Sequence, residues 1–214
     1  MKLYGSDLSP FVQRVKMQVA AKGLDVEYLP PPGGGLKSEE FLAINPIGKI
    51  PCLVTDSGMS LPESEVILEY LEDAFPKPAL RPRKPEERAQ VRLISRVNDI
   101  YVGPAMSKVF GLLGPGKDPA VVKAAIADVN TALGHLEYVL TGKKHAAGNK
   151  FSLADCTITP SLFFVVKLLP TLGVKAPLKN FKKIAKYWKA REKDPVTVKA
   201  IEEMTAELKA RFGM

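Results

Sequence analysis

Apolar residues recur first at strand spacing and then at helix spacing along the first 75 residues, which predicts strands alternating with helices. Strands are expected at 2–5, 26–29, 52–54 and 59–61, with a hairpin turn at Asp56-Ser57-Gly58. Helices are expected from Ser9-Pro10 to Gly23, at 38–43 and at 63–74. The opening order of strand, helix and strand predicts parallel strands joined by a crossover helix.

The pattern changes after residue 75. Four prolines fall between Pro76 and Pro85, which argues against a regular helix or strand there. Beyond them the chain is rich in Ala, Leu, Lys and Glu, and helices are expected at 86–113, 119–140, 152–169, 178–193 and 195–211. We therefore predict an α/β domain at 1–75, a linker at 76–85 and an all-helical domain at 86–214.

Composition indicates a soluble globular protein. Apolar residues make up 46% of the 214 positions, which is enough for a core without disulfides. The longest apolar run noted, 161–170, is interrupted by Lys167 and is too short to cross a membrane, and the first residues lack the apolar region of a secretory signal. The two cysteines, Cys52 and Cys156, have neither zinc-ligand nor disulfide spacing. A cytoplasmic protein without a metal is expected.

The net charge of +8 raises the question of a nucleic-acid or membrane partner. Many basic residues fall in one helical pattern at 179–189, where lysines alternate with Phe181, Ile184, Ala185 and Trp188. This spacing is typical of an amphipathic helix whose basic face is solvated, and we favour that interpretation over a nucleic-acid surface.

Candidate chemistry is concentrated in the run Asn45-Pro-Ile-Gly-Lys-Ile-Pro-Cys-Leu-Val-Thr55 and in Glu63-Ser64. Pro51 lacks a backbone N–H, so it is expected at a strand start or sheet edge, where the preceding backbone stays free to pair with an extended peptide. Glu63 and Ser64 at a helix start would bind the charged end of that peptide. The alternative is that Glu63 and Ser64 only stabilise the helix start.

Ser9-Pro10-Phe11-Val12 stands where a strand gives way to the first helix, which is where thioredoxin-type proteins carry Cys-x-x-Cys. Neither cysteine is present, so dithiol exchange through this motif is excluded. The Ser9 hydroxyl can donate to an anion at the helix N-terminus, but Ser-Pro is also a common helix cap. A further box, Ser152-Leu-Ala-Asp155 preceded by Phe151, is assigned to folding.

Taken in order, these features resemble the cytosolic glutathione transferases of the serine-type, bacterial- or plant-like classes. The resemblance covers nearly the whole chain and implies a thioredoxin-like α/β domain followed by an all-helical domain. It implies that Ser9 is the catalytic serine, that Phe11, Lys49, Ile50, Pro51, Glu63 and Ser64 bind glutathione, and that Pro51 is a cis-proline. It also implies a homodimer, with neither nucleic acid nor membrane as a partner.

The resemblance further implies an enzyme that activates the glutathione thiol and conjugates it to hydrophobic electrophiles. Two alternatives remain open: a glutathione-dependent peroxidase, dehalogenase or lyase acting on a specific metabolite, and a non-catalytic glutathione-binding protein. The Ser-Ser-x-x-x-Arg type motif of the maleylacetoacetate isomerases is missing, and so is an N-terminal cysteine, which argues against isomerase and thiol-transfer chemistry.

Overall fold

The computed structural model describes residues 1–142 and 144–213. The chain forms two compact units, one made of residues 1–79 together with the C-terminal segment from Pro195, and one made of residues 80–194. The domain limits 1–75, 76–85 and 86–214 stay a prediction.

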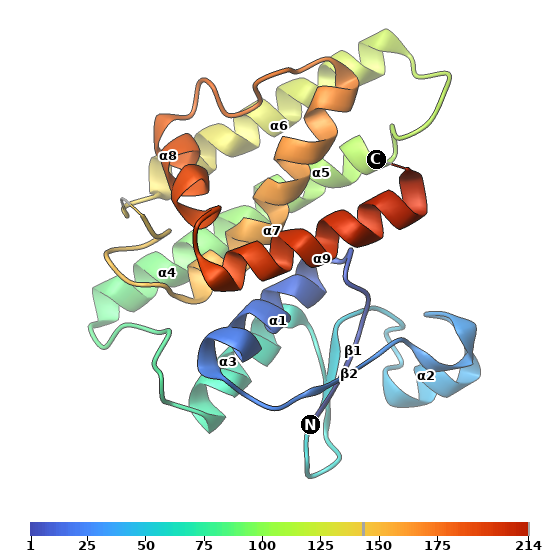
Figure 1. Ribbon diagram of the computed structural model, residues 1–214, viewed down its shortest axis with the longest axis vertical. Helices are drawn as coiled ribbons and strands as arrows, with labels where there is room; N and C mark the ends of the chain where they lie inside the picture. The colour runs from blue at the N-terminus through green and yellow to red at the C-terminus, as the bar shows by residue number, and fades with distance from the viewer. Residues whose placement is uncertain (143, 214) are drawn as a thin grey trace. The chain divides into compact units, whose positions relative to one another are not determined.

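The N-terminal unit contains a small mixed sheet and four α-helices among its described residues (Figure 1). Its elements are β1 Lys2–Tyr4, α1 Pro10–Lys22, β2 Glu27–Leu29, the 3-10 turn η1 Pro32–Gly34, α2 Glu39–Ile44, β3 Cys52–Val54, β4 Ser60–Pro62, α3 Ser64–Ala74 and α9 Pro195–Phe212. Every strand and helix predicted in the first 75 residues is present, with boundaries shifted by at most one residue.

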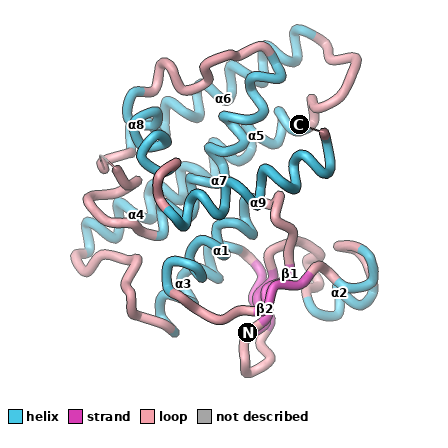
Figure 2. The backbone as a smooth tube through the Cα atoms, in the orientation of Figure 1, coloured by secondary structure: helices cyan, strands magenta, loops and turns pink. Residues whose placement is uncertain are grey.

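The strand order is β2-β1-β3-β4, with β1 and β2 parallel and the other two pairs antiparallel. The predicted strand-helix-strand crossover is therefore confirmed, and so is the hairpin between β3 and β4. Helices α1 and α3 lie on one side of the strands and α2 on the other (Figure 2). The core under α1 and α3 is built from Leu3, Val12, Val15, Leu53 and Ile67, all buried. Burial of these side chains holds the two helices against the sheet.

The second unit is helical throughout its regular elements. These are α4 Pro85–Val97, the π-helical turn η2 Asn98–Val102, α5 Gly103–Phe110, α6 Pro119–Val139, α7 Leu153–Leu168, the 3-10 turn η3 Leu169–Leu172 and α8 Lys182–Arg191. The single stretch predicted at 86–113 is thus divided. Pro104 lacks the N–H that an uninterrupted α-helix needs, and the backbone widens into a π turn just before it.

Helix α7 begins at the predicted capping box. The Asp155 carboxylate accepts hydrogen bonds from the Ser152 N–H at 2.9 Å, the Ser152 hydroxyl at 3.0 Å and the Ala146 N–H at 2.9 Å. The segment Leu153–Leu172 is longer than the apolar run noted in the sequence, and its length and composition would suit a membrane span. Since 83% of its most apolar window of 18 residues is buried inside the protein, its surroundings are those of a core helix.

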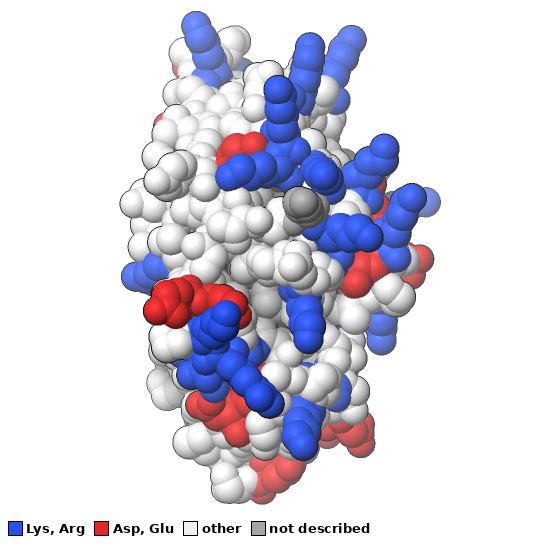
Figure 3. Space-filling view, turned by 90° about the vertical axis from the view of Figure 1, so that its left-hand side faces the viewer, with Lys and Arg blue, Asp and Glu red and all other residues white. Residues whose placement is uncertain are grey.

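The basic helix predicted at 178–193 is α8, and it begins four residues later than expected. Its start is fixed by Glu137, whose carboxylate accepts the backbone N–H groups of Lys183 and Ile184. Ile184, Tyr187 and Trp188 are buried while the lysines are exposed, so the amphipathic pattern is confirmed. Figure 3 shows lysine and arginine side chains over both the upper and the lower part of the face that it views, with acidic side chains among them.

Candidate active site

The sheet register brings the predicted motifs to one end of the N-terminal unit. Cys52 at the start of β3 lies opposite Tyr4 in β1 and opposite Pro62 in β4. The residues just beyond these pairs are Gly5, Pro51 and Glu63, so all three leave the sheet at the same end. The loop after Gly5 leads to α1, and α3 begins directly after Glu63. Two helix N-termini and the Ile50-Pro51 segment therefore share this end of the sheet.

Ser9 is the N-cap of α1, and its side-chain oxygen accepts the Val12 N–H at 3.3 Å. The capping interpretation is therefore confirmed. A hydroxyl accepts through its lone pairs and donates through its proton, so capping leaves the Ser9 proton available to a ligand. The two roles weighed for this serine are compatible. An anion placed there would also face the N-terminal end of α1, which favours negative charge.

The loop before Pro51 is shaped by a buried asparagine. Asn45 donates from its side-chain amide to the Lys49 carbonyl at 2.8 Å, and its side-chain oxygen accepts the Ile47 N–H at 3.2 Å. Gly48 adopts a φ of 62°, and a Cβ there would lie 2.8 Å from the Leu36 carbonyl oxygen. Only glycine fits this turn without strain. The Asn-Pro-x-Gly run thus holds Lys49 and Ile50 in a fixed path.

The backbone of Ile50 is available for pairing. The Ile50–Pro51 peptide bond is cis, as the resemblance implied. Within the described part of the chain, neither the N–H nor the C=O of Ile50 makes a hydrogen bond. Lys49 is exposed beside them. This is the free edge that strand-addition recognition of an extended peptide requires.

Glu63 has a φ of 68° and is the one non-glycine residue with positive φ among those described. Such a conformation is costly for a residue with a Cβ and is concentrated at functional sites. Glu63 is exposed and Ser64, the first residue of α3, is buried. The backbone here therefore turns sharply at the position predicted to bind the charged end of the peptide.

A buried arginine that the sequence reasoning missed joins the starts of α1 and α3. Arg14 is 2% exposed and pairs with Glu65, the residue after Ser64, at 3.3 Å. Its guanidinium lies 5.5 Å from the centre of the Phe11 ring, and Phe11 is 43% exposed. The contact connects the helix turn that carries Phe11 with the turn that carries Ser64. In the sequence, the only sign of this contact is that a charged residue, Arg14, falls at a helix position that faces the core.

The cysteines do not offer an alternative nucleophile. Cys52 lies next to Pro51 but is fully buried, and burial raises the pKa of its thiol above the usual value. A thiol held neutral in this way is a poor nucleophile. Among the described residues there is also no group of three or more His, Cys, Asp or Glu side chains suited to a metal.

Comparison with known proteins identifies the family. The description "Glutathione S-transferase, N-terminal domain" matches residues 3–79, and "Glutathione S-transferase, C-terminal domain" matches residues 100–195. The chain belongs to the glutathione transferase family. The predicted fold of a thioredoxin-like α/β domain followed by an all-helical domain is thereby confirmed, together with the resemblance on which it rested.

Named relatives lie in more than one branch of the family. The chain is 34% identical to the maleylacetoacetate isomerase of Pseudomonas aeruginosa over 76% of this chain and 80% of the relative. It is 30% identical to glutathione S-transferase U7 of Arabidopsis thaliana over 88% of this chain and 81% of the relative. The crystal structure of glutathione transferase F7 from Populus trichocarpa superposes with a TM-score of 0.80 at 27% identity, covering 95% of this chain and 98% of that one.

Proposed function

We propose that this glutathione transferase lowers the pKa of the glutathione thiol through the Ser9 hydroxyl and adds the resulting thiolate to hydrophobic electrophiles. The observation that carries the proposal is the Ser9 hydroxyl itself, which caps α1 as an acceptor and keeps its proton for a ligand. Family membership supplies the ligand class.

Glutathione is proposed to lie along the end of the sheet described above. The Ile50 backbone would pair with the cysteinyl unit, Lys49 would bind the glycyl carboxylate, and Glu63 with Ser64 would bind the γ-glutamyl group. Phe11 and cis-Pro51 would shape the path between them. The free Ile50 backbone and the strained Glu63 backbone support this placement.

The chemical step then follows from thiol ionisation. A thiol with a pKa of about 8.5 is only a few per cent thiolate at neutral pH. A hydroxyl donor together with a helix N-terminus would lower that pKa by about two units, which corresponds to about 2.7 kcal/mol of thiolate stabilisation. The thiolate attacks the electrophilic carbon, a carbon–sulfur bond forms, and the leaving group departs with its electron pair.

The test compares two serines that both cap helices. Ser38 caps α2 and accepts the Phe41 N–H at 3.1 Å, so Ser38→Ala removes a cap as Ser9→Ala does. Each variant is expected to lose about 1 kcal/mol of stability. Only Ser9→Ala is expected to raise the pKa of bound glutathione, by about two units, measured from thiolate absorbance against pH. Equal thiol pKa values in the two variants would refute the assignment.

A second candidate reaction is cis-trans isomerisation, favoured by the isomerase relative. The glutathione thiolate would add to a conjugated carbon–carbon double bond, the resulting single bond would rotate, and elimination would release the same thiolate. Such turnover consumes no glutathione, whereas conjugation consumes one molecule per product. Measuring glutathione consumption on unsaturated dicarboxylates, aryl halides and hydroperoxides separates these reactions. Glutathione binding without turnover on any of them would favour the non-catalytic alternative.

The oligomeric state, the location and the partners are proposed on the same basis. We propose a cytoplasmic homodimer whose partners are glutathione and a small hydrophobic electrophile. Two exposed apolar side chains of the N-terminal unit support an interface, since Ile47 beside the Lys49 loop is 47% exposed and Val66 on α3 is 50% exposed. Sedimentation equilibrium of the wild type and of Val66→Lys tests it, because a lysine on the interface would favour the monomer.

A further inference from the structure

The short loop at residues 5–9, which leads to α1, is held in place by contacts with residues that are distant in the sequence. Gly5 donates its N–H to the Leu29 carbonyl at 2.9 Å, and the Ser9 N–H bonds to the Ser6 carbonyl at 3.0 Å. Between these two bonds lie the side chains of Ser6 and Asp7, and both contact other elements. The placement of the Ser9 hydroxyl therefore depends on what Ser6 and Asp7 contact.

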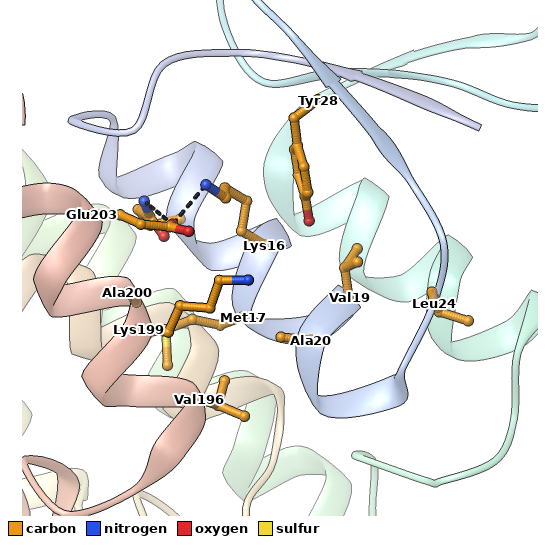
Figure 4. Close-up of a pocket in the computed structure, with 11 residues that line it drawn as sticks. Lys16, Met17, Val19, Ala20, Leu24, Tyr28, Val196, Lys199, Ala200 and Glu203 are labelled. Carbon is orange, nitrogen blue, oxygen red and sulfur yellow. Dashed lines mark hydrogen bonds and ion pairs between the residues drawn. The ribbon is translucent and has the colours of Figure 1, made fainter.

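Lys16 and Gln13 on α1 connect Asp7 to Glu203 on α9. The Lys16 ammonium lies 2.5 Å from the Asp7 carboxylate and 2.6 Å from the Glu203 carboxylate, and the lysine side chain is only 12% exposed. The fully buried Gln13 donates to the Asp7 carbonyl and to Glu203, both at 3.1 Å. Figure 4 shows Lys16 and Glu203 pointing toward each other beside a cavity of about 130 Å³ lined by α1, α9 and Tyr28.

A second set of contacts lies one turn further along α9. Ser6 donates to Glu207 at 3.3 Å and accepts from Arg211 at 3.0 Å, and Glu207 pairs with Arg211. Glu203, Glu207 and Arg211 are spaced by four residues, so they occupy one face of the helix. Both side chains of the loop before Ser9 are thus tied, directly or through Lys16, to that face of α9.

We propose that Glu203 is a positioning residue for the reaction, which acts through Lys16, Gln13 and Asp7 to hold the Ser9 hydroxyl where it can donate to the glutathione sulfur. This inference rests on the proposed function of Ser9. Because the ammonium of Lys16 is largely desolvated and shared by two carboxylates, removing one of them weakens the whole connection. Glu203, Glu207 and Arg211, the residues of α9 that face the loop, lie near the C-terminal end of the sequence and far from Ser9 along the chain.

Removing Glu203 is expected to change the pKa of the bound thiol in opposite directions, depending on whether Glu203 acts by its position or only by its charge. Tyr28 lies beside Lys16, and burial raises the pKa of its phenol, with Glu203 and Asp7 raising it further. The carboxylates thus disfavour a nearby anion, and Glu203 acting by charge alone would disfavour the thiolate as well. Its removal would then lower the thiol pKa. Loss of a positioning residue predicts the opposite, a higher thiol pKa, because the Ser9 hydroxyl is no longer held in place.

The experiment compares Glu203→Ala with Glu202→Ala. Glu202 is the neighbouring exposed residue on α9, so the two variants match in charge and helix propensity. We expect Glu203→Ala to raise the pKa of bound glutathione by about half a unit to one unit, and to lower kcat about three- to tenfold with little change in KM for glutathione. Glu202→Ala should leave both unchanged. Glu203→Gln, which keeps the size of the side chain, replaces Glu203→Ala if that variant does not fold.

A double variant tests whether Glu203 acts through Ser9. In the Ser9→Ala background, Glu203→Ala should produce no further rise in the thiol pKa, because the hydroxyl it positions is already absent. An additive rise would contradict the proposal. So would a lowered thiol pKa in Glu203→Ala, or equal behaviour of the Glu203 and Glu202 variants.

Amide hydrogen exchange in the protein without glutathione separates this inference from the proposed function. Exchange at residues 5–9 should be faster in Glu203→Ala than in the wild type and in Glu202→Ala. If the wild type does not ionise glutathione, the proposed function is wrong, and the exchange result still decides whether Glu203 holds the loop. Unchanged exchange in Glu203→Ala would overturn the inference even where the wild type ionises glutathione.

Discussion

Glu63 combines a positive φ of 68° with a predicted role in binding, and the two can be separated by substitution. Replacing Glu63 by alanine or by glycine removes the carboxylate, so both variants should bind glutathione more weakly to a similar extent. Glycine alone relieves the strained backbone. Glu63→Gly is therefore expected to be more stable than Glu63→Ala by about 1 kcal/mol, the reverse of the usual order.

Calorimetric titration measures the affinity of the two variants for glutathione, and denaturant unfolding measures their stability. Glu69→Ala and Glu69→Gly serve as the control pair, since Glu69 lies in the middle of α3. There the alanine variant should be the more stable one by about 1 kcal/mol. The same order of stability at both positions would show that the backbone at Glu63 carries no strain.

Site residues that belong to one short run of the sequence could be predicted, and contacts between residues far apart in the sequence could not. Ser9, Ile50-Pro51 and Glu63-Ser64 each sit in a short run whose composition already indicates a cap, an edge or a helix start. Glu203 lies 190 positions from its partner Gln13, and an acidic residue on an amphipathic helix has no local feature that distinguishes it. Its role is visible only once α9 packs on α1.

At the scale of elements, hydrophobic spacing and caps predicted most helices because these signals are local. Ser9 and Gly23 bound α1, and Ser152 with Asp155 starts α7, as the sequence indicated. The two helix boundaries that were predicted wrongly have physical causes that hydrophobic spacing does not reveal. The helix expected at 86–113 contains Pro104 and adapts through a π turn, and α8 begins where the distant Glu137 carboxylate accepts its first N–H groups.

The start of α7 yields a prediction about pH. Burial raises the pKa of Asp155 from 3.8 to about 6, although three hydrogen bonds partly stabilise its ionised form. A carboxyl whose pKa is higher in the folded state stabilises the protein below its unfolded pKa. That contribution is lost as the pH rises through the folded value. The nearby His145 has a pKa lowered by burial and by Arg191, so its own contribution to stability changes with pH in the opposite sense. His145 is present in both proteins of the comparison below, which therefore isolates Asp155.

Asp155→Asn keeps the side chain neutral at every pH, and it should be less stable than the wild type because one acceptor becomes a donor. The free energy of unfolding of the wild type is expected to exceed that of Asp155→Asn by the largest margin at about pH 4. This margin should shrink by about 3 kcal/mol toward about pH 7. Urea unfolding across this range measures it. Asp25→Asn, which alters an exposed residue of the other unit, should show no such trend. An advantage that grows with pH would mean that the pKa of Asp155 is lowered by folding.

At the scale of the whole molecule, the last helix of the chain belongs to the first compact unit. Helix α9 buries Ala200, Met204 and Leu208 along one stripe, and its main packing partner is α1. Hydrophobic spacing predicted the helix but not its partner, because an apolar stripe fits any complementary apolar surface. The N-terminal unit is therefore completed only after the rest of the chain has been made.

A chain ending at Asp194 should show this dependence. Removing α9 takes away two large buried apolar side chains, each worth about 1.5–3 kcal/mol, and Glu203, one of the two carboxylates that pair with Lys16. We expect amide exchange in α1 to accelerate strongly and glutathione affinity to fall, while exchange in α7, the core helix of the other unit, changes much less. Full-length Lys209→Ala, an exposed change on the same helix, is the control. Equal acceleration in α1 and α7 would mean that α9 stabilises both units alike, and unchanged exchange in α1 would mean that the N-terminal unit is complete without it.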